Sequence, residues 1–287
     1  MDSNPRRPCS IPALTFVVVT SVAGAACATS APTGTASPAP TPSTATFPAT
    51  TADPGGTNAA DWKRVLPRPE LPADRPLSMA FLLTDGVDGS ELVAPLDVFH
   101  RLRSHLDGHG LRTFTVSPDG EAVDSVEGLA IAADHSFADA PTADVLIVPG
   151  IGGGGEDGAG DPELLEWIRR TGSAARWVVA LRNGTFLLAR AGLLDGRAAT
   201  TFPAAYDGFA GRFPAVDLRV NVSFVHDGPA LTSQGGARSF DVALYLVDHL
   251  FGEEPARRVA AELLLEWPPD QELQPRFVVV PPPPARP

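Results

Sequence analysis

The feature that most constrains the fold is the segment 177–196, in which an apolar strand ends abruptly and a helix begins after a tight turn. Residues 177–181 are all apolar, residues 184–191 are typical of a helix, and Gly192 stands where a helix C-terminal glycine belongs. Such a turn, a nucleophile elbow, holds one side chain at the carboxyl end of a strand. The apex residue here is Arg182, and arginine stays protonated and cannot attack carbon. The sequence therefore predicts the frame of a covalent enzyme with a fixed cation in the nucleophile's place.

Other apolar runs and helical patterns alternate along the chain and predict an α/β fold. Continuous apolar strands of this kind form a mostly parallel sheet that helices cover on both faces. A hairpin or an edge excursion is expected at 121–132, and a hairpin at 223–232, where Asp227-Gly228 makes the turn. The other expected strands are 77–84, 113–116 and 145–148, and the other expected helices are 91–106, 161–170, 240–251 and 255–266.

Several polar or glycine-rich positions follow the carboxyl ends of these expected strands, where ligands bind in open α/β sheets. We therefore expect one ligand site, which consists of Glu91, Gly150, Ile151, Gly152, Arg182, Asn183, Phe202 and Ser233.

Three stretches of this chain are similar to known sequences. Residues 143–150 (Ala-Asp-Val-Leu-Ile-Val-Pro-Gly), 183–201 (beginning Asn-Gly-Thr-Phe-Leu-Leu-Ala) and 231–241 (Leu-Thr-Ser-Gln-Gly-Gly-Ala-Arg-Ser-Phe-Asp) resemble the ThiJ/PfpI family of the class I glutamine-amidotransferase-like superfamily. Glu91, four residues before Pro95, stands where members place an acidic partner of the nucleophile. The resemblance runs from about residue 77 to 267 and implies a flavodoxin-like three-layer sandwich.

The chain departs from the family at two positions. Members usually carry Cys at the position of Arg182 and often His at the position of Phe202. The only cysteines, Cys9 and Cys27, precede the expected domain, so thiolate chemistry is absent from it. We expect no confident catalytic residue, only a relic site of Glu91, Arg182 and Phe202.

Each site residue has a second interpretation. Arg182 is either an anchor for a small anionic or carbonyl ligand, or a surface arginine in a drifted loop. Glu91 either forms a buried salt bridge with Arg182, whose disruption would cost about 3–5 kcal/mol, or is an acid at a helix N-terminus. The amides after Gly150 could form an oxyanion hole, whereas the run of glycines does not open a helix as a dinucleotide fingerprint requires. Ser233 is either a substitute nucleophile or a polar residue that satisfies loop backbone.

Charge and motifs exclude several function classes. The formal net charge is -12 and no basic stripe is present, so we expect no nucleic-acid partner. Some relatives carry a DNA-reading module after this domain, but here only a Pro-rich segment follows Trp267. No zinc-ligand spacing appears among the six histidines, and we expect neither a metal nor a cofactor.

The N-terminal residues indicate export. Residues 1–27 form an expected leader with Arg6-Arg7, an apolar run and Cys27 as a lipidation site. Residues 28–60 form an expected disordered Ala/Thr/Ser/Pro-rich tether, 61–270 the domain and 271–287 a Pro-rich tail. A lipoprotein, a secretory signal that is cleaved or kept as an anchor, and a mis-assigned start all fit. The expected location is a bacterial cell membrane or the exterior.

Three functions remain open from the sequence. The first is a pseudoenzyme that binds a small molecule or a partner. The second is a hydrolase, hydratase or glyoxalase-like enzyme that works without cysteine. The third is a scaffold that dimerises, and the resemblance implies a homo-oligomer in any case.

Overall fold

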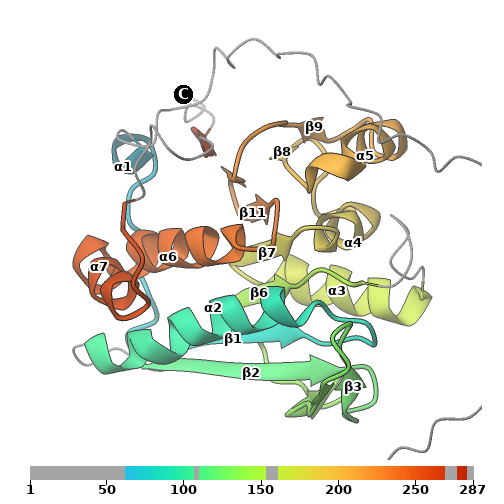
Figure 1. Cartoon of the computed structure of the whole chain (residues 1–287), viewed down its shortest axis with the longest axis horizontal. Coiled ribbons are helices and arrows are strands. Elements are labelled where there is room, and N and C mark those ends of the chain that lie inside the picture. The colour runs from blue at the N-terminus through green and yellow to red at the C-terminus, as the bar shows by residue number, and fades with distance from the viewer. Residues whose placement is uncertain (1–61, 107–109, 153–160, 269–276, 283–287) are drawn as a thin grey trace, which may run out of the picture. The chain divides into compact units, whose positions relative to one another are not determined.

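The computed structural model describes residues 62–106, 110–152, 161–268 and 277–282. Its centre is an eight-stranded sheet with the strand order β12-β10-β11-β7-β6-β1-β2-β5 (Figure 1). Neighbouring strands pair in parallel except for β10 and β11, which form the expected antiparallel hairpin. The predicted α/β fold with a mostly parallel sheet is confirmed.

The bounds of the elements are close to those expected. The strands are β1 (Leu77–Leu82), β2 (Leu111–Ser117), β3 (Val123–Asp124), β4 (Ala130–Ile131), β5 (His135–Ser136), β6 (Val145–Val148), β7 (Trp177–Leu181), β8 (Ala198–Ala199), β9 (Asp217–Leu218), β10 (Phe224–Asp227), β11 (Ala230–Ser233) and β12 (Val278–Val280). The helices are α1 (Trp62–Val65), α2 (Gly89–Leu102), α3 (Pro162–Ala174), α4 (Gly184–Arg190), α5 (Tyr206–Arg212), α6 (Arg238–Phe251) and α7 (Glu253–Glu262), with 3-10 turns at Arg103–His105 and Pro203–Ala205.

Helices cover both faces of the sheet and give the flavodoxin-like three-layer arrangement. Alternate residues of β1 point to opposite faces, so that Met79 and Phe81 enter one core cluster while Ala80 and Leu82 enter the other. The first cluster joins the sheet to α2, α6 and α7, and the second joins it to α3, α4 and α5. In Figure 1 the two groups of helices lie on different sides of the strands.

The C-terminal boundary of the domain differs from the expectation. Residues 278–280 form β12, which pairs in parallel with β10, and Phe277 stacks on Phe224 at a ring-centroid distance of 4.5 Å. The segment assigned to a Pro-rich tail after residue 270 therefore supplies an edge strand and part of the core. Three consecutive valines after an aromatic residue are a strand signal that the surrounding prolines obscured.

The predicted leader, tether and lipidation site at Cys27 lie outside the described residues. Within the part of the chain that the structure describes, no helix combines the length and the apolar character that a membrane span requires.

Candidate functional site

The elbow has the backbone geometry that the sequence predicts. Arg182 follows the last residue of β7 and has a φ of 54°, in the left-handed region that non-glycine residues seldom adopt. Its amide donates to the Ser233 carbonyl at 2.9 Å, and its carbonyl accepts from Thr201 Oγ1 at 2.7 Å. Two neighbouring segments thus hold the strained turn from both sides, as expected where a fold keeps an unfavourable backbone conformation.

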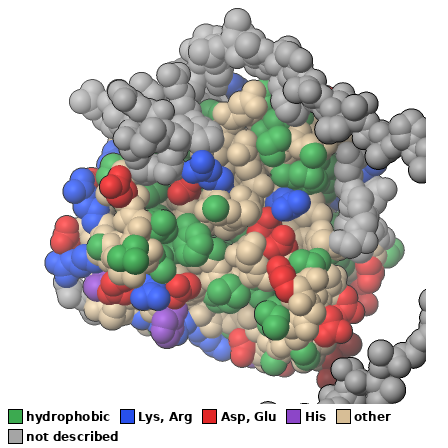
Figure 2. Space-filling model, in the orientation of Figure 1, with side chains coloured by type: hydrophobic (Ala, Val, Ile, Leu, Met, Phe, Trp, Pro, Cys, Tyr) green, Lys and Arg blue, Asp and Glu red, His purple; other side chains and the backbone are tan. Residues whose placement is uncertain are grey.

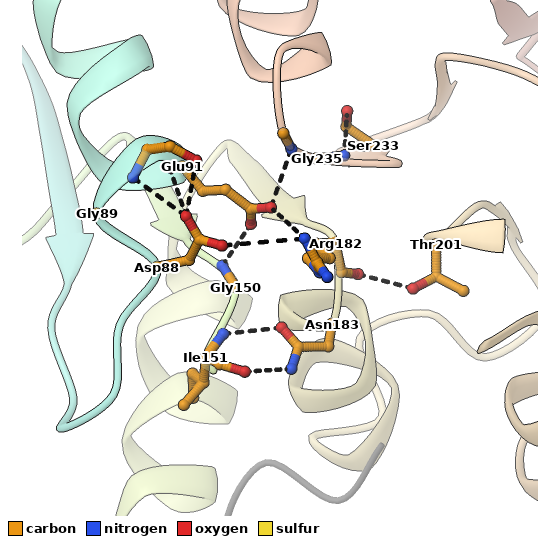
Figure 3. Close-up of polar contacts among 12 residues, drawn as sticks. Asp88, Gly89, Glu91, Gly150, Ile151, Arg182, Asn183, Thr201, Ser233 and Gly235 are labelled. Carbon is orange, nitrogen blue, oxygen red and sulfur yellow. Dashed lines mark hydrogen bonds and ion pairs between the residues drawn. The ribbon is translucent and has the colours of Figure 1, made fainter. Parts of the chain in front are cut away.

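The guanidinium of Arg182 is held by charge and by an aromatic ring. Its Nη1 lies 3.9 Å from Asp88 Oδ2 and 3.9 Å from Glu91 Oε1 (Figure 3). Its Cζ lies 5.0 Å from the centre of the Phe202 ring. The side chain is 45% exposed. Among the described residues none accepts a hydrogen bond from this guanidinium, although the group carries five donors. The cation is therefore positioned, and within the described ranges its donors have no acceptor.

Glu91 is the buried acid of the site. It is 0% exposed, and its two carboxylate oxygens accept from the amides of Gly150 at 2.9 Å and Gly236 at 3.0 Å. Burial raises the pKa of Glu91 to about 7, and the charge of Asp88 acts in the same direction; the two amides and Arg182 oppose this shift. Glu91 is thus close to half-ionised at neutral pH.

The N-terminus of α2 orients this acid. Asp88 caps the helix by accepting from the Ser90 amide at 3.1 Å and from the Glu91 amide at 3.4 Å. Gly235, with a φ of 78°, passes so close to Glu91 and Arg182 that a Cβ there would overlap both side chains. Glu91 is therefore an acid at a helix N-terminus, and its contact with Arg182 is an ion pair of 3.9 Å to a partly exposed guanidinium, not a buried salt bridge.

In the described part of the loop at Gly150, residues 150–152, no amide is left free to form an oxyanion hole. The Gly150 amide donates to Glu91, the Ile151 amide to Asn183 Oδ1 at 2.8 Å, and the Gly152 amide to the Gly86 carbonyl at 2.5 Å. Asn183 Nδ2 returns a bond to the Ile151 carbonyl at 2.5 Å. The glycine-rich sequence suggested free backbone amides, but the amides of residues 150–152 all donate to acceptors within the protein.

Ser233 and Phe202 have supporting positions. Ser233 is buried, its hydroxyl donates to the Ser223 carbonyl at 3.2 Å and accepts from the Gly235 amide at 3.2 Å. This agrees with the interpretation of Ser233 as a loop-satisfying residue rather than a nucleophile. Phe202 instead contributes the face of its ring to Arg182, a favourable arrangement for a guanidinium.

The sequence analysis missed three contributors, which are Asp88, Thr201 and Gly236. Asp88-Gly-Ser-Glu91 has the spacing of a helix capping box, which signals Asp88 as the cap. Nothing local signals Thr201 or Gly236, because their partners lie far away along the chain.

The surface in view offers no continuous basic face. In Figure 2 the acidic side chains gather at the lower right, near the β3 hairpin of Figure 1, whereas acidic and basic side chains alternate at the left. Within the described ranges, no group of three or more His, Cys, Asp or Glu side chains is arranged to hold a metal ion.

The fold and the elbow define a class, the flavodoxin-like α/β proteins with a strained strand-to-helix turn. Residues 77–249 match the DJ-1/PfpI family, and this chain belongs to that family, also written ThiJ/PfpI. A crystal structure of a ThiJ/PfpI family protein from Pseudomonas syringae superposes with a TM-score of 0.60 at 26% identity, over 70% of this chain and 82% of the other.

Two relatives differ in function. Isonitrile hydratase of Pseudomonas putida is 34% identical over 67% of this chain and 79% of its own length. The HTH-type transcriptional regulator CdhR of Pseudomonas aeruginosa is 31% identical over 60% of this chain, but the match spans only 49% of the regulator. The family thus includes both an enzyme and regulators, and membership alone does not choose between them.

Proposed function

We propose that this protein is an exported binding protein whose elbow site holds a small ligand through Arg182 instead of reacting with it through a thiol. The observation that carries the proposal is the apex itself. A fixed cation occupies the strained position at φ 54°, its guanidinium is 45% exposed, and its donors have no acceptor among the described residues. A guanidinium in this state suits a carboxylate or carbonyl oxygen.

Calorimetry with the purified full chain tests this proposal. A panel of small anions and carbonyl compounds is titrated into the wild type and into the Arg182→Gln variant. We expect the wild type to bind at least one compound and the variant to lose at least about tenfold in affinity, because a charge-assisted hydrogen bond contributes about 1.5–3 kcal/mol. Failure of the whole panel, or equal binding by the variant, would overturn the proposal.

One observation favours a second candidate, an enzyme that works without cysteine. Glu91 has a pKa of about 7, which suits a general acid–base at neutral pH. Its complete burial and its two backbone partners argue against direct contact with a substrate. Turnover of isonitriles, amides or aldehydes by the wild type would establish the enzyme instead, whereas turnover by Arg182→Cys alone would support a silenced relic.

Export and assembly are further parts of the proposal. The apolar run before Cys27 and the Ala/Thr/Ser/Pro-rich stretch after it support a lipid anchor or a signal anchor that tethers the domain to a bacterial membrane. Labelled palmitate should enter the wild type in a bacterial host and not the Cys27→Ser variant; equal labelling would refute lipidation at Cys27. Light scattering after gel filtration should give the mass of a homo-oligomer, and a monomer would rule out the dimeric scaffold.

A further inference from the structure

The charges around the elbow do not balance. Two carboxylates, Asp88 and Glu91, each lie 3.9 Å from the single guanidinium of Arg182, which leaves one net negative charge when both acids are ionised. Figure 3 shows the three side chains converging on one point. An anion that approaches the unused donors of Arg182 therefore meets a negative site, unless one acid takes up a proton.

Glu91 rather than Asp88 is suited to accept that proton. Asp88 is partly exposed, and its Oδ1 already accepts hydrogen bonds from the Ser90 hydroxyl at 2.7 Å and from two amides of the first turn of α2. Glu91 is completely buried, and burial disfavours its charge more than the amides of Gly150 and Gly236 stabilise it.

The other charged groups near α2 are engaged elsewhere. Glu127, from the turn between β3 and β4, accepts from the Gly89 amide at 3.1 Å. On α6, Arg238 pairs with Asp241 at 3.0 Å. At the far end of α2, on the side of α7, a network of ion pairs connects Asp97, Arg101, His105 and Glu262. In the described residues, Arg182 is the only cation that pairs with Glu91.

We propose that the elbow site binds a small monocarboxylate and that Glu91 takes up one proton from solvent as the ligand binds. The inference rests on the proposed binding function and specifies its ligand class. A carboxylate matches the planar guanidinium through two parallel hydrogen bonds. Once Glu91 is protonated and neutral, the remaining anions are Asp88 and the ligand. Two anions then lie beside one cation, which is the same charge balance as before binding. The ring of Phe202, which lies over the guanidinium, gives a short aliphatic substituent an apolar neighbour.

Titration calorimetry with propionate tests the inference. Measurements at about one pH unit below and one above the pKa of Glu91 should show about tenfold tighter binding at the lower pH. At the higher pH, buffers with different ionisation enthalpies should report an uptake of nearly one proton per propionate. Equal affinity at both pH values without proton uptake would overturn the inference while the binding function stands.

Two other probes separate this inference from the function on which it rests. Acetamide carries no charge and malonate carries two. If propionate fails but either of these binds through Arg182, the monocarboxylate class is wrong and the binding function survives. If none of the three binds and the wider panel also fails, both proposals fall.

Matched variants locate the proton. Glu91→Gln should bind propionate equally at both pH values, whereas Glu254→Gln, at an exposed acid on α7 away from the site, should retain the tenfold pH dependence. Glu91→Gln places an amide nitrogen against a backbone donor, from Gly150 or Gly236, so circular dichroism first checks that this variant folds as the wild type does. If it does not fold, the proton count of the wild type decides, and an unchanged pH dependence in a folded Glu91→Gln would assign the proton elsewhere.

Discussion

Two groups of buried titratable side chains lie at opposite ends of α6. At its start, the Gly236 amide reaches Glu91 of the elbow site. In its last turn, His249 packs against His226 at a ring-centroid distance of 5.2 Å and near Tyr245 and Trp62. Burial raises the pKa of Glu91 to about 7, but it lowers the pKa of His226 to about 3 and that of His249 to about 4. The same physical cause favours the neutral form at both ends.

The two groups differ in what else surrounds them. Glu91 faces a partly exposed cation, so a proton or ligand can alter its charge balance. His226 is enclosed by neutral partners. Its Nε2 lies 2.9 Å from the Gly228 carbonyl, and because a carbonyl only accepts hydrogen bonds, Nε2 carries the proton. Its Nδ1 therefore accepts a hydrogen bond from the Tyr245 hydroxyl at 2.7 Å. We infer that the elbow end serves binding and the histidine end serves stability.

The largest expected effect is a fall in the free energy of unfolding in acid, where His226 and His249 become protonated. Because the folded-state pKa values of His226 and His249 are depressed, their contribution is present above the unfolded value of 6.5 and is lost as the pH falls toward about 4 and 3. The expected loss is on the order of 3 kcal/mol for His249 and on the order of 5 kcal/mol for His226. Urea unfolding across this pH range measures it.

His249→Phe should remove its share of this acid loss without a large cost at neutral pH, because Nδ1 of His249 is buried without a hydrogen-bond partner in the described structure. His100→Phe, at an exposed position on α2, is the matched control and should leave the acid loss unchanged. Identical pH curves for wild type and His249→Phe would contradict the assignment.

The elbow end should respond to pH in the opposite direction. The folded-state pKa of Glu91 lies above its unfolded value of 4.5, so its contribution is complete below 4.5 and is lost as the pH rises through about 7. The unfolding free energy of the wild type, minus that of Glu91→Gln, should therefore fall by about 3 kcal/mol over this range. The control is Glu254→Gln, at an exposed acid on α7, for which the same difference should not change with pH. If the difference between wild type and Glu91→Gln did not change with pH either, Glu91 would stay ionised over this range.

A smaller effect should separate hydrogen bonding from packing at the histidine end. Tyr245→Phe keeps the ring, which lies 4.8 Å from both Trp62 and Phe224, but removes the donor to His226 Nδ1. The unpaired, buried nitrogen should cost about 1–2 kcal/mol in urea unfolding at neutral pH. A loss of about 0.3 kcal/mol or less, below the usual range for a lost hydrogen bond, would mean that water replaces the hydroxyl.

The elbow end could be predicted from the sequence far better than the histidine end. The apolar run, Arg182 and the glycine after Asn183 are local signals, and the strained φ at Arg182 follows from them. The apposition of His226 and His249 depends on how β10 packs against α6, and no short-range pattern encodes it. The same limit explains why β12 was missed, since its partner β10 lies about fifty residues earlier.

Within the site, the sequence predicted the residues better than their contacts. Glu91 and Arg182 do approach each other, but the amides after Gly150 are engaged by Glu91, Asn183 and the Gly86 carbonyl. A glycine-rich pattern indicates where backbone comes close, and it does not reveal which acceptor the amide meets.

The pair Glu91–Arg182 should show the smallest effect. The sequence suggested a buried salt bridge, for which loss of one partner costs about 3–5 kcal/mol. The structure shows a buried acid and a cation that is 45% exposed, 3.9 Å apart and without a hydrogen bond between them. Solvent therefore screens the attraction, and we expect a coupling of about 0.5–1 kcal/mol.

A double-mutant cycle of Glu91→Ala and Arg182→Ala measures this coupling, at a pH about one unit above the pKa of Glu91 so that the acid is ionised. One unit below that pKa the coupling should shrink toward zero, because the neutral acid no longer attracts the guanidinium. A coupling above about 3 kcal/mol would indicate a desolvated pair. Arg182 would then be committed to Glu91, and its donors would not be available to a ligand. The weak coupling is thus the energetic condition for Arg182 to act as a binding group.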